Sequence, residues 1–185
     1  EDNAEEADYA DTKEAYQQSI QERLIERKYL ESVPSEDLIE DILEYIKTLE
    51  GPVGINIGRK RVTDQIQKIQ RNLDYIANSS DDIFDKIENI LEGDYKIPYF
   101  HKAFWSPIFQ AKYPDHLPNW NNKTELFLKP LGVNLQTSTK AFAEKYKLLA
   151  DAFKYLLYLE PSLNFHKLNH LMHYGTAIEE GRSIM

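Results

Sequence analysis

Basic side chains gather at the start of an expected helix, where they are placed to contact phosphate. A glycine-rich stretch, residues 51–58, precedes five basic residues on one expected helix edge: Arg59, Lys60, Arg61, Lys68 and Arg71. Glycines ahead of a helix let backbone N–H groups approach an anion, and the helix N-terminus attracts it. The spacing is not that of a nucleotide-binding P-loop. Two hypotheses stay open: contact with the phosphates of DNA, or a connector followed by a solvated basic turn.

Three histidines share one face of the last expected helix. His166, His170 and His173 lie at positions i, i+4 and i+7. Imidazoles in this arrangement are potential ligands for zinc or nickel. The stretch lacks the glutamate of an H-E-x-x-H pattern, and no acidic ligand lies nearby in the sequence. The pattern favours a polar exposed face, and no metal or other cofactor is expected.

The sequence contains no arrangement typical of an enzyme. A metal-dependent nuclease needs clustered carboxylates and usually a lysine. Pro114-Asp115 resembles half of such a motif, but no acid-x-Lys follows on a strand. The G-x-S-x-G pattern of serine hydrolases is missing, and there is no cysteine nucleophile. We therefore expect a chain without catalytic activity.

Charge is distributed unevenly along the 185 residues, whose net charge is -9. Residues 1–50 hold 16 acidic and 5 basic residues, whereas the remainder holds 15 and 17. The acidic part would repel nucleic acid, and the later part would not. The chain lacks cysteine and any long apolar run, so we expect a cytoplasmic location and no membrane partner. It begins at Glu1 without a signal-peptide pattern, which we interpret as a piece of a longer protein.

Apolar residues recur every three or four positions, which is typical of amphipathic helices. They predict helices over residues 12–31, 36–50, 62–76, 83–91, 99–112, 122–130, 139–160 and 163–175. No segment alternates as a strand does. The sequence therefore predicts an all-α fold, an irregular bundle of seven or eight helices. The change in charge at the glycine-rich loop divides it into an acidic helical arm, residues 1–50, and a helical core module, residues 51–185.

The turns between these helices carry capping residues. Ser79 and Asp82 are a potential capping box, Gly93 a C-terminal cap, and Asn121 an N-terminal cap. Residues 97–108 have the outline of a helix-hairpin-helix, an apolar residue followed by a loop and a helix. That motif needs glycines where Tyr99 and His101 stand, and their side chains would block the approach of a phosphate.

Residues 96–121 concentrate both tryptophans and four of the eight prolines. The aromatic residues are candidates for a helical core, and the prolines for helix ends. The same stretch carries a series of short motifs, followed later by Leu131-Gly132: Ala103-Phe104-Trp105-Ser106-Pro107-Ile108, Pro114-Asp115-His116-Leu117-Pro118 and Asn119-Trp120-Asn121. In this order, residues 66–175 resemble the helical region that precedes the motor module in McrB-type AAA+ proteins of modification-dependent restriction.

In that family the full protein is a nucleotide-hydrolysing hexameric motor that partners a nuclease subunit, and N-terminal domains select DNA. This chain carries no Walker motif. The resemblance implies a non-catalytic accessory or DNA-recognition module of an anti-phage restriction system, with double-stranded DNA, an AAA+ motor and a nuclease subunit as partners. The residues matching its structural motif are Trp105, Ser106, Pro114, Trp120 and Asn121, and the two tryptophans would touch DNA only if exposed.

Two other functions stay open. The first is a protein–protein adaptor without nucleic-acid contact, in which the acidic arm or an apolar groove binds another subunit. The second is a helical base-excision glycosylase, against which the missing hairpin glycines and the missing catalytic aspartate argue.

Overall fold

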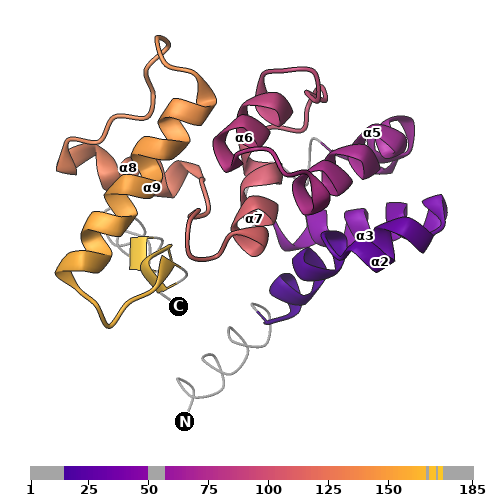
Figure 1. The fold of residues 1–185 in the computed structure, drawn as a ribbon, viewed down its shortest axis with the longest axis horizontal. Coiled ribbons are helices and arrows are strands. Elements are labelled where there is room, and N and C mark those ends of the chain that lie inside the picture. Colours follow the sequence, from indigo (N-terminus) through magenta and orange to yellow (C-terminus); the bar gives the residue numbers. More distant parts are fainter. Residues whose placement is uncertain (1–14, 50–56, 166, 170, 173–185) are drawn as a thin grey trace. The chain divides into compact units, whose positions relative to one another are not determined.

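A computed structural model describes residues 15–49, 57–165, 167–169 and 171–172. These residues contain no strand, which confirms the predicted all-α class (Figure 1). Helical residues 15–24 come first, and residues 165, 167–169 and 171–172 are helical at the other end. Between them lie α2 (Arg27–Ser32), α3 (Ser35–Thr48), α5 (Arg59–Asn78), α6 (Ile83–Leu91), α7 (Lys102–Lys112), α8 (Asn122–Leu128), the 3-10 helix η1 (Lys129–Leu131) and α9 (Phe142–Leu159). Within these ranges no helix combines the length and apolar character needed to cross a bilayer.

The chain divides into two compact units, residues 1–79 and 80–185. The boundary expected at residue 51 lies inside the first unit. The reason is packing, because α3 and α5 stand on either side of that position and pack against each other. The side chains with which α3 and α5 face each other are fully or nearly fully buried, so both helices belong to one unit. The change in charge between them therefore does not coincide with the division between the units.

The first unit is built around the apolar faces of α3 and α5. The buried side chains are Leu38, Ile39, Ile42, Tyr45 and Ile46 on α3 and Val62, Ile69, Leu73 and Ile76 on α5. The amide of Gln70 donates to the carbonyl of Leu30 at 3.1 Å and ties α5 to α2. The single helix expected over residues 12–31 is broken at Ile25 and Glu26, where the backbone turns and then extends. Leu24 and Leu30 are buried on either side of this break.

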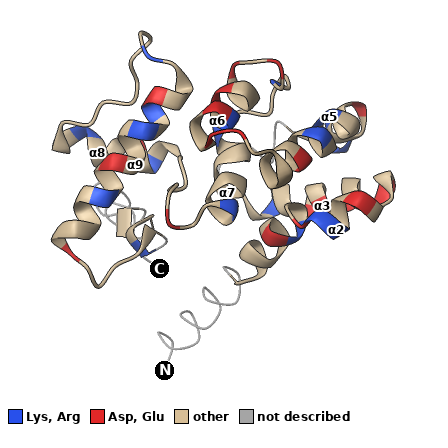
Figure 2. Ribbon diagram, viewed as in Figure 1, with Lys and Arg blue, Asp and Glu red and all other residues tan. Residues whose placement is uncertain are grey.

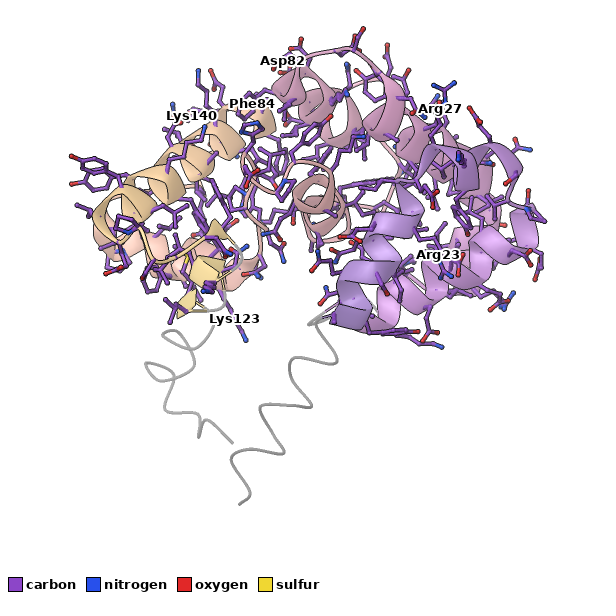
Figure 3. All side chains as sticks on the ribbon, turned by 60° about the horizontal axis from the view of Figure 1, so that its bottom comes forward. Arg23, Arg27, Asp82, Phe84, Lys123 and Lys140 are labelled. Carbon is purple, nitrogen blue, oxygen red and sulfur yellow. The ribbon has the colours of Figure 1, made fainter. Side chains whose placement is uncertain are left out.

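The second unit begins with a capped helix. The Asp82 carboxylate accepts a hydrogen bond from the backbone N–H of Phe84 at 2.8 Å and caps α6 (Figure 3). The capping box expected from Ser79 is therefore wrong, because Ser79 ends α5 as its C-terminal cap. At the other end of α6, Glu92 accepts from the N–H of Phe142 at 2.9 Å. This contact caps α9, which begins at Phe142 rather than at the predicted residue 139.

Aromatic side chains fill the core of the second unit. Phe104 meets Phe100 and Trp105 edge to face, with ring centroids 4.9 and 4.8 Å apart. Trp120 and Tyr146 meet in the same way at 5.3 Å. All five rings are fully or almost fully buried. The dense aromatic stretch is thus the structural centre of this unit, as edge-to-face pairs contribute beyond the area they bury.

Tyr99 has a backbone conformation that favours glycine. Its φ is 74°, the only positive value at a non-glycine position in the described part of the chain. We expect Tyr99→Gly to be more stable than Tyr99→Ala by about 1 kcal/mol, because both variants lose the ring and only alanine keeps the strained Cβ. Urea unfolding measures this difference. The control is Leu126, inside α8, where Leu126→Ala should be more stable than Leu126→Gly. If the glycine variant is the more stable one at both positions, or the alanine variant at both, the prediction is contradicted.

Candidate nucleic-acid interface

The predicted phosphate-binding residues belong to α5, whose apolar side is buried in the first unit. Four of them lie within an arc of about 100° that borders the arc of the buried side chains: Lys60, Arg61, Lys68 and Arg71. Lys60, Lys68 and Arg71 are exposed, and Arg61 is half-buried at the edge of this arc. We call these four residues the basic face of α5. A helix buried on one side must present its polar residues on the other, so packing of α5 gathers the four cations.

Arg59 lies apart from the basic face. Its guanidinium donates to Glu36 at 3.2 Å and also forms an ion pair with Glu40, both on α3. The hydrogen bond to Glu40 raises the pKa of Arg59 above its ordinary value. Two carboxylates therefore already compensate the charge of Arg59 before any phosphate arrives. Sequence reasoning grouped Arg59 with its neighbours because the local pattern predicts the helix over residues 36–50 but does not show that this helix packs against α5.

Two carboxylates interrupt the basic residues of α5. Asp64 lies one turn from Lys60, Arg61 and Lys68, and Asp74 lies near Arg71. Asp74 accepts a hydrogen bond from the Asn78 amide at 2.7 Å. Basic and acidic segments are both visible on α5 in Figure 2. With five basic and two acidic residues, the helix keeps a net charge of +3.

The two tryptophans of the central stretch are buried. Trp105 and Trp120 are at most 1% exposed, so neither ring offers a surface on which a base can stack. Trp105 donates its indole N–H to the carbonyl of Phe100 at 3.1 Å. The condition under which these tryptophans would touch DNA is therefore not met in this structure.

The other motif residues organise the loop around Trp120. The Ser106 hydroxyl accepts from the backbone N–H of Trp120 at 3.0 Å and donates to the Asn119 side chain at 2.8 Å. Asn121 caps α8 by accepting from the N–H of Thr124 at 2.9 Å, as its position in the sequence predicted. Pro114 is exposed. The structure thus brings Ser106, Trp120 and Asn121 together and leaves Pro114 at the surface.

A buried carboxylate completes this loop. Glu125 is 7% exposed and accepts from the Trp120 indole at 2.7 Å and from the Gln136 amide at 3.2 Å. Lys102 forms an ion pair with the same carboxylate, and its ammonium lies 4.8 Å from the centre of the Trp120 ring. Burial raises the pKa of Glu125, but the hydrogen bond and charge of Lys102, with the bonds from Trp120 and Gln136, outweigh it. The pKa is therefore lowered. We call these four residues the Glu125 network.

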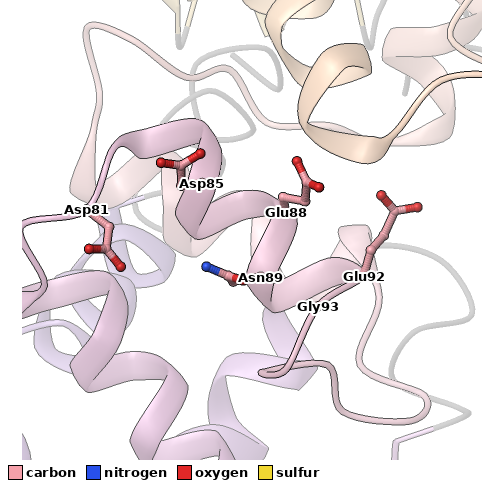
Figure 4. Close-up of a pocket in the computed structure, with 6 residues that line it drawn as sticks. All are labelled: Asp81, Asp85, Glu88, Asn89, Glu92 and Gly93. Atoms are coloured by element: carbon pink, nitrogen blue, oxygen red, sulfur yellow. The ribbon is translucent and has the colours of Figure 1, made fainter.

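An acidic depression lies on α6 and the turns at its two ends. Its lining comprises Asp81, Asp85, Glu88, Asn89, Glu92 and Gly93 (Figure 4). Glu92 also caps α9. No group of three potential ligands in the described ranges is arranged to hold a metal ion. His166, His170 and His173, weighed above as ligands, lie outside the described residues.

Comparisons with protein-family models, curated proteins and solved structures gave no match to this chain.

Proposed function

We propose that the chain is a non-catalytic helical binding module that contacts nucleic-acid phosphates through the basic face of α5. The observation that carries this proposal is the exposure of Lys60, Lys68 and Arg71 on the solvent side of a helix whose opposite side is anchored in a core. Lysine and arginine side chains on a rigid helix neutralise phosphates and release counterions. Arg59, held by Glu36 and Glu40, has a secondary part in this binding.

The resemblance to McrB-type proteins gives the proposal its biological setting. We propose that the chain belongs to a restriction system in which it contacts double-stranded DNA or couples recognition to an AAA+ motor with its nuclease subunit. The support is the order of the motifs between Ala103 and Gly132. Such a module needs no chemistry of its own, and because both tryptophans are buried, the proposed binding does not include stacking of bases on their rings.

The test is the affinity for plain and modified DNA duplexes at two salt concentrations. We expect the affinity to fall at least tenfold between about 50 and 200 mM salt. The triple variant Lys60→Ala, Lys68→Ala, Arg71→Ala should weaken binding. It should also reduce the magnitude of the slope of log affinity against log salt concentration by about 3. Fluorescence anisotropy of a labelled duplex measures both quantities.

The control variant removes the same charge from the second unit. Lys129, Lys140 and Lys154 are exposed, and replacing all three by alanine leaves α5 intact. This variant should keep most of the affinity and the salt dependence. An equal loss in both triple variants would show that overall charge, not the basic face, determines binding. No affinity at low salt for any duplex would refute nucleic-acid contact.

A second candidate function is a protein–protein adaptor, which the acidic surfaces favour. Glu36 and Glu40 line the exposed side of α3, and the depression on α6 carries the carboxylates of Asp81, Asp85, Glu88 and Glu92. Such surfaces repel phosphate and attract basic partners. Absence of DNA binding, together with salt-sensitive binding of a basic partner that is lost on neutralising Asp85 and Glu88, would favour the adaptor.

A further inference from the structure

The line of α5 that lies opposite its buried side carries polar side chains. Lys60, Asp64, Gln67 and Arg71 follow one another at intervals of four, three and four residues, and all four are exposed. At 100° per residue they fall within an arc of about 60°. The centre of this arc lies opposite the centre of the apolar side chains that α5 buries: Val62, Ile69, Leu73 and Ile76. We call Lys60, Asp64, Gln67 and Arg71 the crest of α5.

Asp64 does not suit a crest that contacts only phosphate. Its side chain is exposed, and Lys60 and Lys68 lie one turn away on either side of it. A carboxylate among cations repels a phosphate that approaches the crest. The same carboxylate accepts a hydrogen bond from the amino group of cytosine when the crest faces the edges of bases. Asp64 therefore favours contact with bases over contact with phosphate alone.

Gln67 and Arg71 have the chemistry of base recognition as well. Gln67 carries no charge to attract phosphate, but its amide both donates to and accepts from adenine in a paired contact. Arg71 lies one turn further along, and a guanidinium pairs with two acceptors of guanine. From Asp64 to Arg71 the helix rises about 10 Å, which equals about three base-pair steps. The three side chains therefore reach neighbouring bases of one short site.

The residues beside the crest suit the walls of a DNA groove. Lys68 and Thr63 are exposed and lie about 70° to either side of the centre of the crest. Both side chains can donate to phosphate oxygens. The major groove of B-DNA admits a helix, so the crest would face the bases while the two flanks face the phosphates of the two strands. Arg59, on the side of Thr63, is paired with Glu36 and Glu40, so phosphate contact is stronger on the side of Lys68.

We propose that α5 is a recognition helix that reads the sequence of duplex DNA in the major groove, with Asp64, Gln67 and Arg71 contacting base edges. The inference rests on the proposed function, because it names the way in which α5 meets DNA. To phosphate contact that is blind to sequence it adds a preference for cytosine at Asp64, adenine at Gln67 and guanine at Arg71. Duplex RNA is the weaker partner, since side chains cannot read its deep, narrow major groove.

Selection by the full chain from a pool of DNA duplexes with a randomised centre tests the proposal. Sequencing of the bound fraction should show a preferred site of about three or four base pairs. Fluorescence anisotropy then compares the selected duplex with a duplex of scrambled order and with the RNA duplex of the selected sequence. The selected DNA should bind at least about tenfold more tightly than either.

Single variants separate base contact from phosphate contact. Gln67→Ala should remove a discrimination of about 5- to 150-fold at one base pair and leave the salt dependence unchanged, because no charge is lost. Gln18→Ala is the matched control and should change neither quantity, since Gln18 is exposed in the same unit outside α5. Lys68→Ala should weaken binding to selected and scrambled duplexes alike and reduce the magnitude of the salt slope by about 1.

Asp64→Asn decides whether the crest meets bases. It should lower the ratio between the affinities for the selected and the scrambled duplex and change the preferred base at one position. An equal rise in affinity for every duplex would overturn the proposal, because the carboxylate would then only repel phosphate. Binding without sequence preference would also overturn it but leave the proposed function standing, whereas no binding to any duplex would refute both. Circular dichroism verifies that the variants keep their helices.

Discussion

Replacing Glu125 by alanine is expected to lower the free energy of unfolding of the second unit by about 3–5 kcal/mol. The carboxylate is buried and accepts hydrogen bonds from the Trp120 indole and the Gln136 amide beside the Lys102 ammonium. Alanine leaves these donors without their acceptor and leaves the half-buried Lys102 ammonium without its partner. Tryptophan fluorescence during urea unfolding measures the loss, because both tryptophans lie in this unit.

Two further variants separate the charge from the shape of the side chain. Glu125→Gln keeps the size and one acceptor but loses the ion pair, so it should cost less than alanine. Lys102→Met removes the cation and keeps the length of the side chain. The double variant Lys102→Met, Glu125→Gln should lose less than the sum of the single losses, because neither charge is then left alone. Additive losses would show that the two residues do not interact.

The stability of the wild-type chain should also depend on Glu125 in acid. Its pKa in the folded state is lowered below the ordinary value of 4.5, so the folded chain binds a proton less readily than the unfolded chain. The stabilisation is complete above that ordinary pKa and is lost as the pH falls through the lowered folded value. Glu125→Gln should remove this part of the acid dependence. An unchanged slope below pH 4.5 would contradict the assignment.

Local patterns predicted the helices well and the boundary of the units poorly. The spacing of Leu38, Ile42 and Ile46 identified α3, and Asn121 was recognised as a cap from its neighbours alone. Such features depend on residues within one or two turns. The division at residue 79 depends instead on α3 packing against α5 across the glycine-rich stretch, which no local charge balance reveals.

The candidate site shows the same limit. The basic face of α5 follows from the spacing of its cations along the sequence. Because the apolar side of the helix is buried, the polar side with these cations must face the solvent. The pairing of Arg59 with Glu36 and Glu40 spans 23 and 19 residues, and Lys102 meets Glu125 across another 23. These contacts join different helices. The sequence gives the charged residues, but only the packed structure identifies which of them pair.

Replacing Trp105 by alanine should destabilise the second unit by about 3–5 kcal/mol. The ring is fully buried, packs edge to face on Phe104 and donates its N–H to the carbonyl of Phe100. Alanine would leave a cavity and an unpaired carbonyl, whereas Trp105→Phe keeps most of the volume and should cost less. Urea unfolding followed by circular dichroism measures both.

Leu131→Ala is the control for the loss of an apolar side chain at the surface. Leu131 is exposed, so its replacement should change the stability by less than about 0.5 kcal/mol.

The Trp105 variants also test DNA binding. Trp105→Phe should leave the affinity for a duplex unchanged if the ring only packs the core. A small loss of stability in Trp105→Ala combined with a large loss of affinity in Trp105→Phe would instead assign Trp105 to the nucleic-acid surface. It would also contradict the burial of this ring in the aromatic core of the second unit.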